Sequence, residues 1–550
     1  ISSSYSSDIY INTSDILFNN DWEDYSVNPL LASKVYREAH HWVMEDIVFD
    51  DGYGIKIESN ASFIIRNCTV NSSTIGISIH NTNMNFTLIH NNLTDCVLEG
   101  IQITNCSYLQ NSTTLIDNTV HGCSHSGINL NRCKNATLIN NTILSNGQGI
   151  SITNCNYIEF INNTARRNMD YGIYILECNN TLLQNGTICS NEKSGIYMVE
   201  SINCSLGNNT ACFNEKNAFR IKNCINTTVH NNLLLDNGGY GINLQTCFQV
   251  MLFSNVVGNC SNVGLFSSDC ENIHIRWNQF YEKNIIWLSE TNFSKLQTYD
   301  IPNGSNELDN KPIASYNDTR GLCAENFTDV SEVILINCND SVINEVDVPI
   351  FNYYCENNTI SHNNVREQRV GIWLIGGSNH SIGYNNVSSN YYGLAILGCC
   401  NTIVENNTIN KNGFEMGGVL IQPLGGFPAS GNSFWNNTVN QNDYYGLTAV
   451  NIDLLSLRNN SFNFNGRCGI WLYESSHNTI LENKIENNTL DGILLTSAFM
   501  GSTDNEFEDN KISQNSRMGI KIDAENDDNV LNGNTFWNNG QDGIYVESSD

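Results

Sequence analysis

Histidine and cysteine alternate in one short segment of the chain, at His121, Cys123 and His125. Alternate residues of an extended chain project to the same side, and imidazole and thiolate are ligands that zinc and copper accept. The spacing therefore makes this segment a candidate metal site. A turn containing incidental histidines is the simpler interpretation, and we predict no cofactor. Calcium at acidic turns, such as residues 523–528, stays open.

Carboxylate pairs are the second feature that could do chemistry, because glycoside hydrolysis uses two of them. The acidic pairs are Asp50-Asp51 and Asp527-Asp528, and neither has a basic partner at a matching position. Arg166 and Arg167 are adjacent cations whose simplest role is a solvated surface. We therefore assign no catalytic residues, and an enzyme is the less favoured interpretation.

A repeat runs through most of the chain and must position these side chains. A glycine followed by an aliphatic residue recurs every 22 to 28 residues in two series. The first series comprises Gly54, Gly76, Gly100, Gly127, Gly149, Gly172, Gly195, Gly241 and Gly264, with Ala218 in one position, and the second comprises Gly371, Gly393, Gly418, Gly446, Gly469, Gly492, Gly519 and Gly543.

Apolar residues stand one and three positions after the glycine, as at Ile173 and Ile175, with a polar or aromatic residue such as Tyr174 between them. This period of two predicts a short strand with one buried face. No single repeat can bury that face alone, so the repeats must stack as coils. The sequence predicts an all-β parallel solenoid of about 21 coils.

Asparagine makes up 93 of the 550 residues, and much of it falls at fixed repeat positions. Thirteen residues after the glycine we predict an inward ladder that bonds coil to coil, formed by Asn140, Asn162, Asn185, Asn208 and Asn231. A second column stands at Asn146, Asn168, Asn191, Asn214 and Asn237.

Cysteines follow the same register in a structural column formed by Cys106, Cys133, Cys155, Cys178, Cys224, Cys247 and Cys270. Buried thiols, disulfides between adjacent coils and a soft-metal column all remain open, in that order of preference. Better candidates for disulfides are the pair Cys189 and Cys212 and the residues Cys323, Cys400 and Cys468, which fall outside the column.

The sequence contains about 29 Asn-x-Ser/Thr sequons, more than its composition predicts, which favours secretion and N-linked glycans. Sequons on the predicted inward ladder could not carry sugar. The preferred glycosylation candidates lie outside the regular register, at Asn12, Asn292, Asn303, Asn317 and Asn326.

Four segments are predicted: a cap over residues 1–50 with a short amphipathic helix near residues 32–42, a first array over 51–290, an irregular insertion over 291–330, and a second array over 331–550. The last repeat has no closing segment, so we expect either that more chain follows residue 550 in the gene or that the open coil pairs with another subunit.

The pattern G-I-x-[IL]-x-x-[SC], as in Gly172 to Cys178, followed by Asn-Asn-Thr, resembles right-handed parallel β-helix proteins. Among these, the break around Leu308–Ile313 and Ser331–Cys338 resembles archaeal cell-surface proteins and the periplasmic copper-binding family that matures nitrous oxide reductase. The resemblance implies a β-helical scaffold on which many activities occur.

The chain has 26 Lys and Arg against 56 Asp and Glu, a net charge of −30, which excludes nucleic acid and disfavours acidic polysaccharides. No apolar run is long enough to span a membrane. We expect an extracellular structural or adhesive protein, a glycosylated rod that self-associates into a cell-surface layer, sheath or filament. The alternatives are a polysaccharide-acting enzyme or glycan-binding protein, and a periplasmic copper-handling protein.

Overall fold

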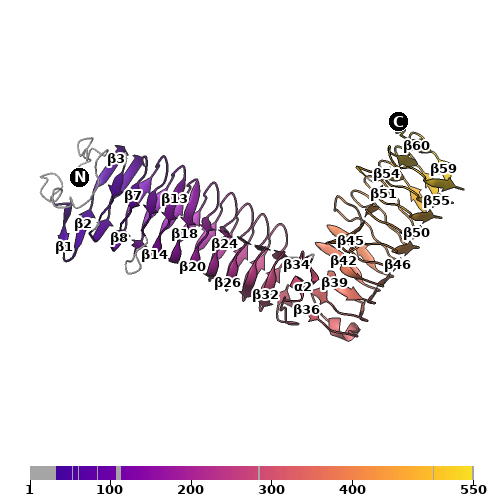
Figure 1. Ribbon diagram of the computed structural model, residues 1–550, viewed down its shortest axis with the longest axis horizontal. Helices are drawn as coiled ribbons and strands as arrows, with labels where there is room; N and C mark the ends of the chain where they lie inside the picture. Colours follow the sequence, from indigo (N-terminus) through magenta and orange to yellow (C-terminus); the bar gives the residue numbers. More distant parts are fainter. Residues whose placement is uncertain are drawn as a thin grey trace. The chain divides into compact units, whose positions relative to one another are not determined.

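The computed structural model describes residues 33–52, 54–59, 61–82, 84–106, 113–282, 285–290, 292–499 and 501–547. It consists of short strands stacked as parallel coils in two compact units. Unit 1 comprises residues 1–290 and 298–300, and unit 2 comprises residues 291–297 and 301–550. The predicted all-β solenoid of about 21 coils is confirmed (Figure 1).

Three sheets form unit 1, parallel throughout except for the β1–β2 pair, and each coil of the array adds one strand to each sheet. The first, which we call sheet A, has twelve strands: β1 (Val35–Glu38), β2 (His41–Glu45), β5 (Phe63–Arg66), β8 (Phe86–Ile89), β11 (Thr113–Ile116), β14 (Lys134–Ile139), β17 (Asn156–Ile161), β20 (Asn179–Gln184), β23 (Ile202–Gly207), β26 (Ile225–His230), β29 (Phe248–Phe253) and β32 (Glu271–Arg276). Sheet B runs from β3 (Val48–Gly52) to β33 (Gln279–Tyr281).

Sheet C contains the strands that follow the repeat glycine: β4 (Ile55–Ile57), β7 (Ile77–His80), β10 (Ile101–Thr104), β13 (Ser126–Asn131), β16 (Gln148–Thr153), β19 (Ile173–Leu176), β22 (Ile196–Val199), β25 (Phe219–Lys222), β28 (Ile242–Gln245), β31 (Leu265–Ser268) and β34 (Ile286–Leu288). Equivalent residues pair in register, as Ile173 pairs with Ile196 and Tyr174 with Tyr197. The aliphatic residues are fully buried, so the predicted alternation is confirmed.

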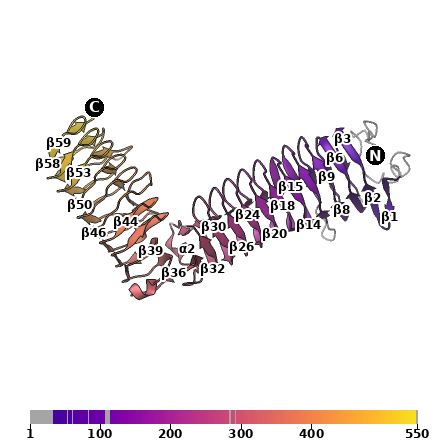
Figure 2. The same cartoon turned by 180° about the vertical axis from the view of Figure 1, so that it is seen from behind.

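Unit 2 repeats the arrangement. Its sheet after the glycine, which we call sheet D, contains β36 (Lys311–Asn317), β37 (Glu332–Ile336), β39 (Ile350–Glu356), β42 (Val370–Ser378), β45 (Tyr392–Leu397), β47 (Val419–Gln422), β49 (Leu447–Val450), β51 (Ile470–Tyr473), β54 (Ile493–Thr496), β57 (Ile520–Ile522) and β60 (Ile544–Val546). One of the other two faces runs from β38 (Val342–Asn344) to β58 (Val530–Asn532). The other contains β41 (Asn364–Arg366) paired with β44 (Asn386–Ser388), and a three-stranded sheet from β53 (Lys484–Glu486) to β59 (Thr535–Trp537). Figure 2 labels β44, β53, β58 and β59.

The predicted helix in the cap is wrong. Residues 32–42 contain β1, which pairs antiparallel with β2, and β2 joins sheet A by pairing parallel with β5. A strand satisfies the unpaired N–H and C=O groups at the edge of the first coil, which a helix cannot do. Residues 1–32 of the cap, with the candidate Asn12, lie outside the described residues, and β3 already begins sheet B at Val48.

The segment predicted as an insertion is partly array. It contains the short helix α2 (Phe293–Leu296), β35 (Glu307–Leu308) and the 3₁₀ turn η1 (Ala324–Phe327), but β36 already pairs parallel with β37 as the first strand of sheet D. Residues 298–300 extend unit 1, where Asp300 forms a parallel bridge with His274. In the described part of the chain no helix is long and apolar enough to cross a membrane.

Candidate functional site

The predicted ladder at Asn140, Asn162, Asn185, Asn208 and Asn231 is wrong by one residue. All five side chains are exposed, and each backbone is left-handed with φ between 53° and 56°. A left-handed residue turns the chain through a corner, so the alternation that holds along the strand does not continue past it. The buried ladder is formed by the asparagine that comes directly after the left-handed corner residue, at Asn118, Asn141, Asn163, Asn209, Asn232, Asn255 and Asn278.

Each ladder amide bonds to the neighbouring coils. The Asn163 oxygen accepts hydrogen bonds from the backbone N–H and the side-chain amide of Asn141, both at 2.9 Å, while its own amide donates to the Leu138 carbonyl at 2.7 Å. The second predicted column, Asn146 to Asn237, is buried and bonded in the same way. These asparagines are therefore structural.

The seven predicted column cysteines are buried free thiols. Each stands after a left-handed residue at the third corner of the coil, and Sγ of Cys155 accepts the Cys133 N–H at 3.3 Å. Burial raises the pKa of the Cys224 thiol to about 12, so it remains protonated. Cys189 and Cys212 form a disulfide, whereas Cys323, Cys400 and Cys468 are free.

His121, Cys123 and His125 do not share a side, which corrects the expectation from their spacing. Gly122 has φ +74°, Cys123 is 1% exposed inside the coil, and both histidines lie on the surface. Among the described residues no group of three or more His, Cys, Asp or Glu side chains could hold a metal ion.

The glycosylation candidates of the irregular segment lie at the surface except Asn326, which is half-buried. Asn292 caps α2 by accepting the Ser294 N–H, and Asn303 bonds Ser315 and Tyr316. Asn326 accepts the Cys323 N–H, and Asn317 is exposed. Three of these four asparagines thus already have structural roles.

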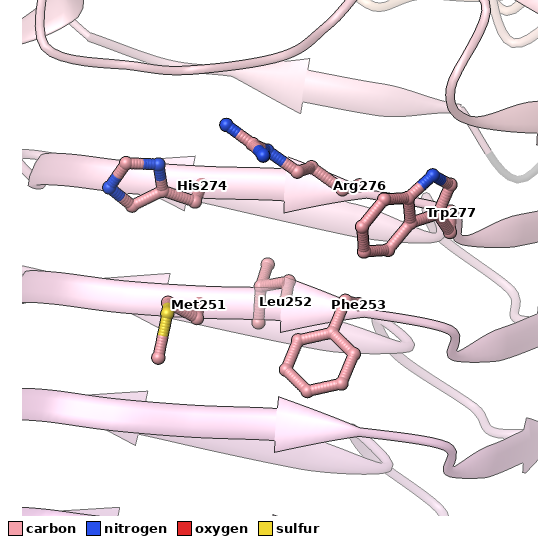
Figure 3. Close-up of a pocket in the computed structure, with 6 residues that line it drawn as sticks. All are labelled: Met251, Leu252, Phe253, His274, Arg276 and Trp277. Carbon is pink, nitrogen blue, oxygen red and sulfur yellow. The ribbon is translucent and has the colours of Figure 1, made fainter.

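A hollow of about 400 Å³ lies on the outer face of sheet A, over β29 and β32 (Figure 3). Its lining residues are Met251, Leu252, Phe253, His274, Arg276 and Trp277. Strand alternation points Met251, Phe253, His274 and Arg276 outward, while Leu252 forms the floor. In Figure 3 the Trp277 ring lies beside Phe253 and the His274 ring beside Met251.

The outward side chains of sheet A form two columns that run from coil to coil, and the residue types in these columns change along the array to form the hollow. One column runs Gly207, His230, Phe253 and Arg276, with the His230 and Phe253 rings stacked at 5.2 Å. A Cβ at Gly207 would lie 2.5 Å from the His230 ring, so glycine makes room for it. The result is an aromatic surface that leads into the hollow.

Charged groups close one edge of the hollow. Oδ2 of Asp300 accepts hydrogen bonds from Arg276 and from Nδ1 of His274, the latter at 2.9 Å. Burial alone would raise the pKa of Asp300, but the hydrogen bonds from Arg276 and His274 outweigh it and hold the pKa below its usual value. Asp300 is therefore a carboxylate that fixes the side chains of Arg276 and His274.

Trp277 occupies a left-handed corner with φ +56° and is 62% exposed. The preceding coils place Asn208, Asn231 and Ser254 at this corner. A bulky side chain is disfavoured in this conformation, although Phe213 occupies another left-handed corner with φ 54°. Exposed Trp277, together with Met251 at 43%, gives the hollow an apolar rim.

Sequence reasoning missed the hollow entirely. Its lining residues come from two coils, and Asp300, which bonds two of them, lies beyond the last regular repeat of the first array. Aligning the outward columns of the repeat, and not only the inward ones, would have exposed the change from Gln184 to His230 and Phe253.

The fold and this surface define a parallel β-solenoid with an aromatic, partly charged hollow on one outer face. The chain belongs to the family described as right handed beta helix region, which matches residues 1–130, 99–246, 313–453 and 451–550. The narrower resemblance to archaeal surface proteins and the copper-binding family stays a prediction. No curated protein matches the chain in sequence.

Several solved structures are similar in fold. The PL6 family alginate lyase AlyGC is 8% identical, covers 92% of this chain and 97% of its own, and gives a TM-score of 0.33. A double mutant of the periplasmic alginate epimerase AlgG is 12% identical over 62% of this chain and 77% of its own, with a TM-score of 0.30. The A-module of the Azotobacter vinelandii mannuronan C-5 epimerase AlgE6 is 11% identical over 89% and 91%, with a TM-score of 0.19. Likeness at these values carries no information on ligand or activity.

Proposed function

We propose that the protein binds carbohydrate and that the hollow on sheet A receives a sugar ring. The observation that carries this proposal is the exposed Trp277 ring beside Phe253, next to the fixed pair His274 and Arg276. A sugar presents an apolar face of C–H groups and an edge of hydroxyls. Aromatic rings suit the face, and a few fixed polar groups suit the edge.

Binding fits the hollow better than hydrolysis. Glycoside hydrolysis uses two carboxyl groups, one of them protonated. None of the six lining residues is acidic, and the neighbouring Asp300 has a lowered pKa and is committed to Arg276 and His274. We therefore favour a glycan-binding protein, the alternative left open by the sequence, over an enzyme and over the structural or adhesive rod that the sequence favoured.

We place this binding outside the cell. The Cys189–Cys212 disulfide supports an oxidising compartment, and the sequon number agrees with secretion. An adhesive cell-surface protein would then hold its glycan through the outer faces of its coils. Self-association and N-linked glycans remain further proposals, separate from the hollow.

The test is a Trp277→Asn variant, measured against the wild type on a glycan array and by titration with the best ligand. Asparagine suits the left-handed corner, so we expect the free energy of unfolding to be unchanged or higher, by about 1 kcal/mol at most. Affinity should fall at least about tenfold, as expected for a lost aromatic contact. Product analysis after long incubation should show intact glycan.

Phe213→Asn is the matched control. Phe213 is also an exposed aromatic residue at a left-handed corner, with φ 54° and 60% exposure, but it lies outside the hollow. Its replacement should leave binding unchanged. Equal losses in both variants, or a wild type that binds no glycan, would show that the hollow is not a carbohydrate site.

A further inference from the structure

The outer face of sheet C carries, near its beginning, a group of polar side chains that the hollow does not use. Parallel pairing places Lys56, Ser78 and Gln102 in one outward column, over β4, β7 and β10. His80 and Thr104 pair in the neighbouring column, two residues further along the same strands. Three successive coils thus bring two hydroxyls, an imidazole, an amide and an ammonium group together on one face.

Ser78 and His80 form a direct hydrogen-bonded pair. Oγ of Ser78 lies 2.5 Å from Nε2 of His80, and Nδ1 of the same ring bonds the Thr104 hydroxyl. A neutral imidazole carries one proton, and when Nδ1 donates it to Thr104, Nε2 accepts the proton of Ser78. A hydroxyl that is bonded to a base, which a third side chain orients, is the arrangement of an activated nucleophile.

The surroundings of His80 favour its neutral form. Its side chain is half-buried, and burial lowers the pKa of His80 below its usual value. The Lys56 ammonium lowers that pKa further, while the Glu58 carboxylate opposes both effects. At neutral pH the imidazole is therefore uncharged and can act as a general base.

Two further groups stand where negative charge would develop on a substrate. The Gln102 amide lies beside Ser78, with Oε1 3.1 Å from Oγ, and a rotation of this amide by half a turn presents its N–H donors instead. The Lys56 ammonium belongs to the strand one coil before Ser78, and successive coils are about 4.8 Å apart. Side-chain amides and cations stabilise a developing oxyanion.

The next coils show that the scaffold does not need this group. The same two outward positions hold Asn129 and Asn131 on β13, and Ser151 and Thr153 on β16. Neither strand contains histidine, yet both pair in the same register as β7 and β10. The Ser78–His80 pair is therefore an addition to the outer face and not a requirement of the fold.

We propose that Ser78 and His80 form an esterase site for short-chain carboxylic esters, such as acetyl esters. His80 removes the Ser78 proton as Oγ bonds the acyl carbon, and it gives that proton to the alkoxide as the ester bond breaks. Water then attacks the acyl-serine with His80 again as the base, which releases the carboxylic acid and restores Ser78. Ser78 is 5% exposed, so a small acyl group suits the site. Ester cleavage leaves glycosidic bonds untouched, so this activity is separate from the sugar site proposed on sheet A.

A fluorophosphonate probe and p-nitrophenyl acetate test the site in the full-length protein. The probe should form a covalent adduct at Ser78, located by peptide mass mapping, and the ester should release nitrophenolate. Ser78→Ala and His80→Gln should each lower kcat/KM at least about 100-fold, as expected for the loss of the nucleophile or of its base. Thr104→Val should lower kcat about tenfold with KM unchanged, and Thr104→Ser should restore it, because Thr104 only positions His80.

Ser151→Ala is the matched control, because Ser151 occupies the same outward column as Ser78 but has Thr153 where β7 has His80. It should react like the wild type. Circular dichroism and the unfolding midpoint establish that every variant is folded. The proposal is overturned if the probe does not modify Ser78, or if folded Ser78→Ala or His80→Gln cleaves the ester at the wild-type rate.

Discussion

At the scale of the residue, one backbone conformation explains most of the unusual composition. Each corner of a coil is a single left-handed residue, and asparagine tolerates this conformation better than most side chains. The residue after it turns inward and accepts an N–H from the adjacent coil. A strand then begins, often with threonine. The fold itself therefore favours Asn-Asn-Thr, and part of the sequon excess has a structural origin.

His380 shows what happens when the inward position holds a titratable group. Its side chain is 1% exposed, and Nδ1 accepts the Asn358 N–H at 3.3 Å. Burial lowers the pKa of His380 to about 4, whereas an unfolded histidine titrates near 6.5. Between these values the unfolded chain binds a proton that the folded chain does not, so stability falls as the pH falls.

We predict that the free energy of unfolding decreases by about 3 kcal/mol as the pH is lowered from about 6.5 to about 4. His380→Asn places the ladder residue of other coils at this position and should remove that part of the pH dependence. Chemical denaturation at several pH values measures it. An unchanged pH profile in the variant would show that other groups are responsible.

At the scale of the element, the strands are too short to be stable alone and depend on the corners between them. A three-residue strand such as β18 (Thr164–Arg166) contributes few contacts, but each corner adds an inward side chain that bonds two coils. This is why exposed and buried asparagines stand side by side with different roles. The difference can be measured on one adjacent pair.

Asn163→Ala should be much more destabilising than Asn162→Ala. The first substitution leaves two donors of Asn141 and the Leu138 carbonyl without their partner inside the coil, which we expect to cost about 3 kcal/mol. The second removes only an exposed side chain from a left-handed corner and should cost about 1 kcal/mol. Denaturation of the full-length variants tests the order.

Asn162→Gly is the matched control, because glycine adopts the left-handed conformation freely. It should be close to neutral. If Asn162→Ala proved as damaging as Asn163→Ala, the exposed corner side chain would have a bonding role that the structure does not show.

At the scale of the whole molecule, the net charge of −30 is the dominant property. The buried interior is aliphatic with asparagine and cysteine columns, and few acidic side chains are buried within the described residues, so the net charge lies mostly on the surface. Like charges repel more in the compact state than in the unfolded chain. The charge therefore opposes folding at low ionic strength.

Raising sodium chloride from about 10 mM to about 150 mM should increase the unfolding midpoint, because the screening length falls from about 30 Å to about 8 Å. A thermal melt at each concentration measures the effect. A midpoint that falls with salt would indicate that favourable ion pairs such as Arg66–Glu45 outweigh the net repulsion.

The sequence alone determined the solenoid. The glycine period, and the alternation at positions such as Ile173 and Ile175, depend only on neighbours in the chain and on the need to stack coils, so they could be predicted. The cysteine column and the second asparagine column followed from the same register. Both columns occupy inward positions, where the side chain is buried inside the coil.

Only the tertiary structure decided where the corners fall and what the outer faces carry. The ladder is at Asn141 and not Asn140 because one left-handed residue resets the alternation, which residue type alone does not show. The hollow joins Phe253 and Trp277 from successive coils, and Asp300 from beyond the last regular repeat holds the lining residue Arg276. Outward side chains do not pack the core, so the repeat leaves them free to vary, and their meeting across coils becomes visible only when the coils are stacked.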